Sequence, residues 1–131
     1  MRDAMKIDRL DHFVLTVRDM SASMAFYEAL GMTAMTFGNN RKALAFGRQK
    51  INLHEAEAPM TPHAKSPTPG SADFCLIAEG TIDAVVAHLE RAGVVIEEGS
   101  VVRTGALGAI TSVYCRDPDG NLVEISCYDQ K

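Results

Sequence analysis

The feature that most constrains the fold is an internal repeat in the order of structural signals. In each half, an alternating apolar segment leads to a helix-capping residue, a helical stripe of apolar residues, a glycine and further strand-like segments. Asp19 and Gly31 mark the start and end of the first helix, and Thr81 and Gly93 mark those of the second. A repeat of this length predicts two similar units that pack about a pseudo-twofold axis.

The segments between these signals predict two helices and a set of strands in one domain. The helices are expected over 21–30 and 81–92. The strands are expected over 7–17, 33–37, 43–47, 51–55, 72–78, 94–98, 110–116 and 122–127. Four prolines and a glycine fill the stretch between the halves, and proline interrupts helices and central strands. We therefore expect one domain over 1–131, with module 1 at about 7–57, a linker at about 58–71 and module 2 at about 72–128.

Composition and charge argue against several function classes. The formal net charge is −4 and the sequence pI is about 5.5, so the chain lacks the basic footprint of a nucleic-acid-binding protein. No apolar run approaches the roughly 18 residues that a membrane helix needs, and the N-terminal residues lack the apolar core of a signal peptide. The three cysteines form no CxxC pair, which indicates free thiols in a cytoplasmic protein. The expected partner is a small molecule, and neither nucleic acid nor a membrane.

Strand alternation places an unusual set of polar residues on one face of each sheet. Phe13, Leu15 and Val17 share the face that a helix must cover, so His12 faces the other side. The same register in the other inner strands gives a polar set of six residues: His12, Asn52, His54, Asp73, Glu124 and Ser126. Buried polar groups need partners, and imidazole with carboxylate suits Zn, Mn, Ni, Co or Fe(II). The pattern therefore predicts a divalent metal ion or a bound polar ligand.

Three segments resemble those of the vicinal oxygen chelate superfamily: residues 10–15 (LDHFVL), 26–32 (FYEALGM) and 116–124 (RDPDGNLVE). That superfamily includes glyoxalase I, the thiol transferases that modify fosfomycin, the extradiol dioxygenases and the bleomycin-binding proteins. The similarity spans about residues 7–128, and within the superfamily the chain is most similar to small glyoxalase-domain proteins. The resemblance implies an α+β fold of two βαβββ modules, whose curved mixed sheets surround a shared cavity.

The resemblance also implies roles for individual residues. The family's first-strand histidine corresponds to His12, and its last-strand glutamate corresponds to Glu124. The family's second histidine falls on Asp73, and the second glutamate of glyoxalase I falls on Asn52, with His54 two residues further along the same face. We therefore expect a divalent metal ion held by His12 and Glu124, with His54 or Asp73 completing the ligand set and Glu124 also serving as the catalytic carboxylate.

Two function classes follow from this set. The first is a metal-dependent glyoxalase-type lyase or isomerase, or a related thiol-conjugate enzyme, acting on a thiol-conjugated carbonyl compound. Asn52 and Arg103 are then assigned to substrate binding, Arg103 because its cation can hold an anionic group. Asn52 cannot act as a base in place of the family's glutamate. That departure favours the alternative, a non-catalytic protein that sequesters a drug or metabolite, for example cationic bleomycin. An extradiol dioxygenase ranks third, because larger members of that group exceed one two-module domain.

Exposed strand edges predict the association of two chains. Each module has unpaired edge strands and a single helix to cover its sheet, so pairing with a second copy would bury what one chain leaves exposed. The resemblance to the superfamily points the same way. We therefore expect a homodimer, in which the cavity closes either within one chain or between two.

Overall fold

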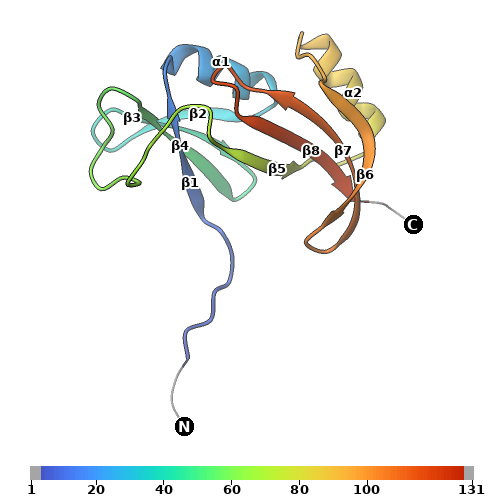
Figure 1. The fold of residues 1–131 in the computed structure, drawn as a ribbon, viewed down its shortest axis with the longest axis horizontal. Coiled ribbons are helices and arrows are strands. Elements are labelled where there is room, and N and C mark those ends of the chain that lie inside the picture. The colour runs from blue at the N-terminus through green and yellow to red at the C-terminus, as the bar shows by residue number, and fades with distance from the viewer. Residues whose placement is uncertain (1–3, 129–131) are drawn as a thin grey trace.

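The fold contains two copies of one order of elements (Figure 1). A computed structural model describes residues 4–128 of the chain. The first copy consists of β1 (His12–Val17), α1 (Met20–Ala29), β2 (Thr33–Phe37), β3 (Arg41–Phe46) and β4 (Gln49–Glu55). The second copy consists of β5 (Asp73–Ile77), α2 (Ile82–Arg91), β6 (Glu98–Gly105), β7 (Gly108–Arg116) and β8 (Leu122–Tyr128). These two βαβββ modules confirm the predicted α+β fold.

Each module forms one mixed sheet of four strands. The strand order is β1-β4-β3-β2 in sheet A and β5-β8-β7-β6 in sheet B. The β1–β4 and β5–β8 pairs are parallel, whereas all the other pairs are antiparallel. Within residues 4–128 the two sheets remain separate and form no closed barrel, so β1 and β5 are both edge strands.

Both helices begin and end where local signals predict, to within one residue at each end. The side chains of Asp19 and Thr81 each accept a hydrogen bond from a backbone N–H in the first helical turn, which satisfies a donor that the helix leaves free. Gly31 and Gly93 follow the helices with φ of +107° and +76°, a conformation that favours glycine. Each helix has ten residues. In the described part of the chain, no helix is long and apolar enough to cross a membrane.

The strand registers confirm the internal repeat. Val14 of β1 lies opposite Asn52 of β4, and Cys75 of β5 lies opposite Glu124 of β8. Asn52 and Glu124 therefore occupy equivalent positions in the two modules, as the alignment of the halves predicts.

The first strand is shorter than its sequence alternation predicts. A strand is expected over 7–17, but β1 begins only at His12. Its partner β4 begins at Gln49, so residues 4–11 have no strand to pair with among the described residues (Figure 1). They run away from the body of the fold as an extended segment.

The sixth strand lies further along the chain than predicted. A strand is expected over 94–98 with a loop after it, but β6 covers Glu98–Gly105 and pairs with β7. Val94 and Ile96 instead pack against the hydrophobic core without joining a strand. Glycine weakens the local strand signal in β6, and the hydrogen bonds that form with β7 override it.

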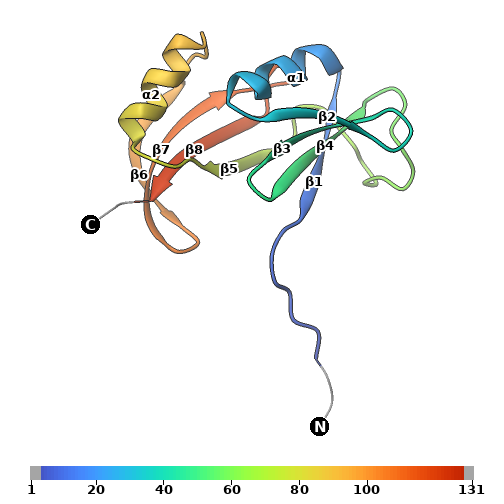
Figure 2. The same ribbon diagram turned by 180° about the vertical axis from the view of Figure 1, so that it is seen from behind.

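Both helices lie on one side of the sheets, and the hydrophobic core lies between helices and sheets (Figure 2). One cluster of buried side chains spans both modules and includes Leu15 of β1, Tyr27 of α1 and Leu89 of α2. The rings of Phe13 and Phe74 meet edge to face between β1 and β5, with centroids 5.0 Å apart. Full burial of one large apolar side chain contributes roughly 1.5–3 kcal/mol. The opposite faces of the sheets, which we name inner face A and inner face B, are not covered by the helices.

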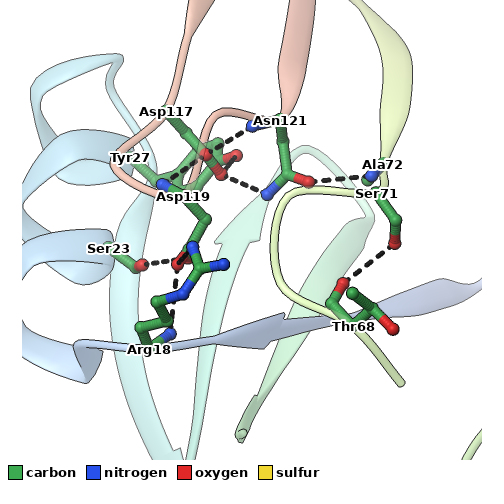
Figure 3. A network of polar contacts seen from close by, with 9 residues as sticks. All are labelled: Arg18, Ser23, Tyr27, Thr68, Ser71, Ala72, Asp117, Asp119 and Asn121. Atoms are coloured by element: carbon green, nitrogen blue, oxygen red, sulfur yellow. Dashed lines mark hydrogen bonds and ion pairs between the residues drawn. The ribbon is translucent and has the colours of Figure 1, made fainter. Parts of the chain in front are cut away.

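A polar network joins the two modules at the β7–β8 turn (Figure 3). The buried carboxylate of Asp117 accepts hydrogen bonds from Tyr27 Oη of α1 and from Asn121 Nδ2, both at 2.7 Å. Asn121 Oδ1 accepts a hydrogen bond from the N–H of Ala72 at 2.8 Å. Burial, and then the bond to Asp117, raises the pKa of Tyr27 well above its ordinary value, so its hydroxyl remains a donor. We name Tyr27, Asp117 and Asn121 the inter-module clamp.

Asp119 adds a second link beside the clamp (Figure 3). Its side chain is 3% exposed, and its carboxylate pairs with Arg18 at 3.3 Å and accepts a hydrogen bond from Ser23 Oγ at 3.5 Å. Gly70, near the end of the linker, packs directly against the backbone of Asp119. The linker and the β7–β8 turn are therefore held against module 1.

Replacing Gly70 by alanine is expected to destabilise the fold more than the same change at Gly80. Both glycines have a positive φ, of +83° and +94°, which costs an alanine roughly 1–2 kcal/mol. A Cβ at Gly70 would lie 2.5 Å from the carbonyl oxygen of Asp119, whereas a Cβ at Gly80 would have nothing within 4 Å. In urea unfolding, Gly70→Ala should therefore lose about 1–3 kcal/mol more than Gly80→Ala. Equal losses would contradict the close packing of the linker.

Candidate functional site

Strand β4 presents Lys50, Asn52 and His54 to inner face A. These residues alternate with apolar side chains that pack toward the helices. In the β1–β4 register, His12 lies opposite Lys50, and Thr16 lies opposite His54. Two of the expected metal ligands, His12 and His54, and the expected substrate-binding Asn52 therefore share this face.

Two buried polar atoms on inner face A lack a partner. Asn52 and His54 are each only 5% exposed, and Asn52 Oδ1 and His54 Nδ1 have no hydrogen-bond partner among the described residues. Burial first, and then the charges of Arg41 and His63, lowers the pKa of His54, so its ring is neutral near pH 7. Neutral imidazole and amide oxygen can both bind a cation, and buried polar atoms without partners are costly. A ligand on inner face A would remove that cost.

His12 begins β1 with its ring oriented by a neighbouring carboxylate. Its Nδ1 lies 2.8 Å from Asp11 Oδ1, and its side chain is 41% exposed. The hydrogen bond to His12 is the main reason that the pKa of Asp11 is lowered. A carboxylate on one ring nitrogen fixes the ring and directs the other nitrogen outward, as carboxylates do for metal-binding histidines. His12 is therefore suited to hold a ligand at the mouth of inner face A.

Two buried serines position Glu124 on inner face B. Ser112 Oγ of β7 donates to Glu124 Oε2 at 2.6 Å, and Ser126 Oγ lies 3.4 Å from the same oxygen. The two serine hydroxyls also lie 2.6 Å apart, and both residues are fully buried. These bonds use Oε2, and none of those that the structure records uses Oε1. The carboxylate is thus fixed at one oxygen, and the other is available to a ligand.

Asp73 and Cys75 stand on inner face B at the edge strand β5. Both residues are exposed, and Cys75 Sγ lies 3.2 Å from Ser126 Oγ. Although the residue is exposed, the surrounding protein partly shields its thiol from water, and this desolvation is the largest influence and raises the pKa of Cys75. The hydrogen bond with Ser126 lowers that pKa, and the charge of Glu124 raises it. The thiol is therefore protonated near pH 7, which argues against a role as a nucleophile.

Two cavities adjoin these faces. The larger, of about 960 Å³, lies along β1 and β5 and is lined by His12 and Asp73 together with Phe13, Phe46 and Phe74. The smaller, of about 420 Å³, lies on inner face B and is lined in part by Cys75, Arg103, Tyr114 and Glu124. Volumes of this size suit a small molecule.

Arg103 lies in the smaller cavity beside Glu124. Its Nε donates to Tyr114 Oη at 3.0 Å, and its Nη2 pairs with Glu98 at 3.4 Å. The guanidinium is therefore partly occupied by the protein itself. It retains N–H groups, because an arginine carries five donors.

The structure divides the expected ligand set between the two sheets. His12 and His54 lie on inner face A, and Asp73 and Glu124 lie on inner face B. Within residues 4–128, no three His, Cys, Asp or Glu side chains lie close enough together to hold a metal ion. Imidazole nitrogen and carboxylate oxygen fit a divalent metal chemically, but the described residues of one chain do not assemble three of them.

Sequence reasoning missed Ser112 as a member of the site. The alternation of Ile110, Ser112 and Tyr114 along a predicted strand could have placed it on the same face as Glu124. Lys50 on inner face A was also missed, because a lysine near the end of a strand is usually expected to be exposed to solvent.

Comparisons with known proteins agree with this geometry. A family model described as the Glyoxalase/Bleomycin resistance protein/Dioxygenase superfamily matches residues 9–125. Virulence protein STM3117 of Salmonella typhimurium is 58% identical over 125 residues, which is 95% of this chain and 87% of that protein. Its crystal structure matches with a TM-score of 0.93 over 95% of this chain and 100% of that chain.

Two further proteins extend the comparison. Glyoxalase domain-containing protein RDO1 of Mycosarcoma maydis is 47% identical over 124 residues, which is 95% of this chain and 70% of that protein. A lactoylglutathione lyase from Agrobacterium tumefaciens shares the fold at 24% identity, with a TM-score of 0.71 over 93% of this chain and 95% of that chain. The resemblance seen in the motifs is thereby confirmed. The chain belongs to the Glyoxalase/Bleomycin resistance protein/Dioxygenase superfamily.

Proposed function

We propose that the protein is a metal-dependent enzyme of glyoxalase type, acting on a small molecule in a cavity that two chains complete. The observation that carries this proposal is the division of the candidate ligands into two half-sites. Inner face A offers buried atoms of Asn52 and His54 that have no partner among the described residues. Inner face B offers Glu124, held at one oxygen by Ser112. Each half lacks what the other provides.

The exposed edges support closure between two copies. β1 and β5 are the edge strands nearest the half-sites, so each has backbone groups that can pair with another chain. The carboxylates of the candidate set, Asp73 and Glu124, lie on inner face B, and its imidazoles, His12 and His54, lie on inner face A. A cavity between inner face A of one chain and inner face B of a second would therefore combine both kinds of ligand.

In this proposal His12 of one chain, with Glu124 and Asp73 of its partner, would hold a divalent cation. His54 lies opposite Thr16, roughly 13 Å along β1 from His12, so it is the less suitable candidate for the same ion. The chemistry supplied by such a cation, when bound, would be Lewis-acid polarisation of substrate oxygens. Glu124 would also move a substrate proton through its unoccupied oxygen, while Ser112 prevents its carboxylate from rotating. Asn52 carries no basic group, so it would orient the substrate.

Other features of the assignment follow from the same arrangement. Arg103 would hold an anionic group of the substrate next to Glu124 in the smaller cavity. A thiol-conjugated carbonyl compound remains the substrate class that we propose. The thiols of Cys75, Cys115 and Cys127 are free, which supports the cytoplasm as the compartment.

Metal content gives the first test. The purified protein should hold a divalent metal in a fixed ratio to chain, and Glu124→Gln should lower its metal affinity by about 10- to 100-fold, because one charged ligand becomes neutral. Glu90→Gln, an exposed change on α2, serves as the matched control and should retain the metal. Inductively coupled plasma mass spectrometry after dialysis measures both. If both variants retain the metal, Glu124 is not one of its ligands.

A second function is favoured by Asn52. Where the family's glutamate would be a base, an amide cannot take up a proton, and the larger cavity is lined by several aromatic rings. Both features suit a non-catalytic protein that sequesters a drug or metabolite. That function predicts binding of a small apolar ligand that persists after exhaustive chelation and in Glu124→Gln. The metal-dependent enzyme predicts that neither condition preserves productive binding.

A further inference from the structure

Two cations on inner face A share one aromatic ring. The guanidinium carbon of Arg41 lies 4.8 Å from the ring centroid of Phe37, and Lys50 Nζ lies 3.8 Å from the same centroid. Among residues 4–128, neither Arg41 nor Lys50 forms an ion pair or a side-chain hydrogen bond. Both side chains are half-buried. Two like charges are thus held near one ring, and no described residue pairs with either of them.

Neither Asp11 nor Lys42, two neighbouring charged residues, accounts for the charges of Arg41 and Lys50. Asp11 is near enough for Lys50 to affect it, but the pKa of Asp11 is lowered first by its hydrogen bond to His12 and least by Lys50. Lys42, on the opposite face of β3, has its own partners in Thr36 Oγ1 at 3.1 Å and Asn40 Oδ1 at 3.4 Å. The two cations without an anionic partner, Arg41 of β3 and Lys50 of β4, therefore both lie on inner face A.

The two cations adjoin the buried atoms that lack partners. Asn52 and His54 follow Lys50 on the same face of β4. The β3–β4 ladder pairs Lys42 with Leu53, so the preceding residue of β3, Arg41, lies beside His54. The charge of Arg41 also reaches the His54 ring. Cationic donors and an accepting amide oxygen, Asn52 Oδ1, therefore stand side by side.

We propose that inner face A contains a subsite for a small organic acid. Its carboxylate binds between Arg41 and Lys50, and an O–H or N–H group next to the carboxylate donates to Asn52 Oδ1. A carboxylate satisfies both cations at once, and the donor satisfies the buried oxygen. The ring of Phe37 stabilises both cations through cation–π contacts. The subsite rests on the small-molecule function proposed above and adjoins the larger cavity through Lys50, but it requires neither the metal nor Glu124.

Titration of the full-length, chelator-treated protein tests the subsite. L-malate carries a carboxylate beside a hydroxyl, succinate lacks the hydroxyl, and inorganic phosphate lacks the carboxylate. Amide shifts in ¹H–¹⁵N spectra should move around Phe37, Arg41 and Asn52, with malate binding more tightly than succinate or phosphate. Arg41→Met and Lys50→Met should each weaken malate binding by about tenfold, since each removes a charge-assisted bond. Lys42→Met is the matched control and should change the affinity less than twofold, because its charge points to the other face.

Several results would overturn the subsite. Equal weakening in Lys42→Met would show diffuse attraction. Equal affinities for malate and succinate would remove the role of Asn52, and equal affinities for malate and phosphate would show a general anion site. Malate binding that needs added metal, or that disappears in Glu124→Gln, would place the anion on the metal instead. Dissociation of a dimer by Arg41→Met and Lys50→Met without ligand would show that carboxylates of a second copy occupy the cations. If the metal proposal alone fails, malate binding to the chelator-treated protein survives.

Discussion

Replacing Asp117 by alanine should lower the free energy of unfolding by about 4 kcal/mol, because several buried donors would lose their acceptor together. The carboxylate accepts from Tyr27 Oη, from Asn121 Nδ2 and from the backbone N–H groups of Asp119 and Asn121, at 2.7 to 2.9 Å. Asp117 is 5% exposed, so water cannot easily replace it. The change should appear in urea unfolding as a lower midpoint with an unchanged slope.

Tyr27→Phe tests the hydrogen bond between the modules without changing the hydrogen bonds of the β7–β8 turn. It removes one hydroxyl and leaves the backbone bonds of the β7–β8 turn in place, so the loss should be only about 1–2 kcal/mol. In the double variant, the two losses should be less than additive, because both changes remove the same hydrogen bond. A small effect of Asp117→Ala, similar to that of Tyr27→Phe, would contradict the central place of Asp117 in the inter-module clamp.

A mixed dimer of two damaged chains should recover metal binding that neither homodimer has. One chain carries Glu124→Gln and the other carries His12→Ala, with different affinity tags to isolate the mixed species. If a site takes inner face A from one chain and inner face B from the other, one site of the pair keeps both residues and the second loses both. The mixed dimer should then hold about one metal ion, whereas each homodimer has two defective sites. His12 is 41% exposed, so its replacement should not disturb folding.

Closure within one chain gives the opposite result. Each chain would then carry one defective site, and the mixed dimer would bind metal as poorly as the homodimers. Light scattering on the same samples gives the assembly state, and a monomer mass at micromolar concentration would contradict the proposed two-chain cavity. A wild-type protein without metal in any state would instead favour the sequestration function.

Much of the fold could be predicted because its signals are local. The capping side chains of Asp19 and Thr81 act on backbone groups within the same helical turn, and Gly31 and Gly93 act on the residue that ends the helix. The equivalence of Asn52 and Glu124 required only the repeated order of elements, because strand alternation then assigns each residue a face.

Predictions failed where a partner strand decided the result. The start of β1 depends on where β4 begins, and β6 exists because β7 supplies its hydrogen bonds despite two glycines. The inter-module clamp was also not predicted. Residues 116–124 indicated a turn, but nothing local shows that Asp117 meets Tyr27, ninety positions away in the chain.

By itself, the sequence determined the two-module α+β fold, the helix boundaries and the polar character of both inner faces, because periodicity and capping act over a few residues. Only the tertiary structure decided how the candidate ligands are distributed. It placed His12 and His54 on one sheet and Asp73 and Glu124 on the other, with no three-ligand group among residues 4–128. It also placed Arg41 and Lys50 beside Phe37 with no anionic partner among the described residues. Distances between sheets depend on how two modules pack, and that packing is set by contacts between residues far apart in the chain.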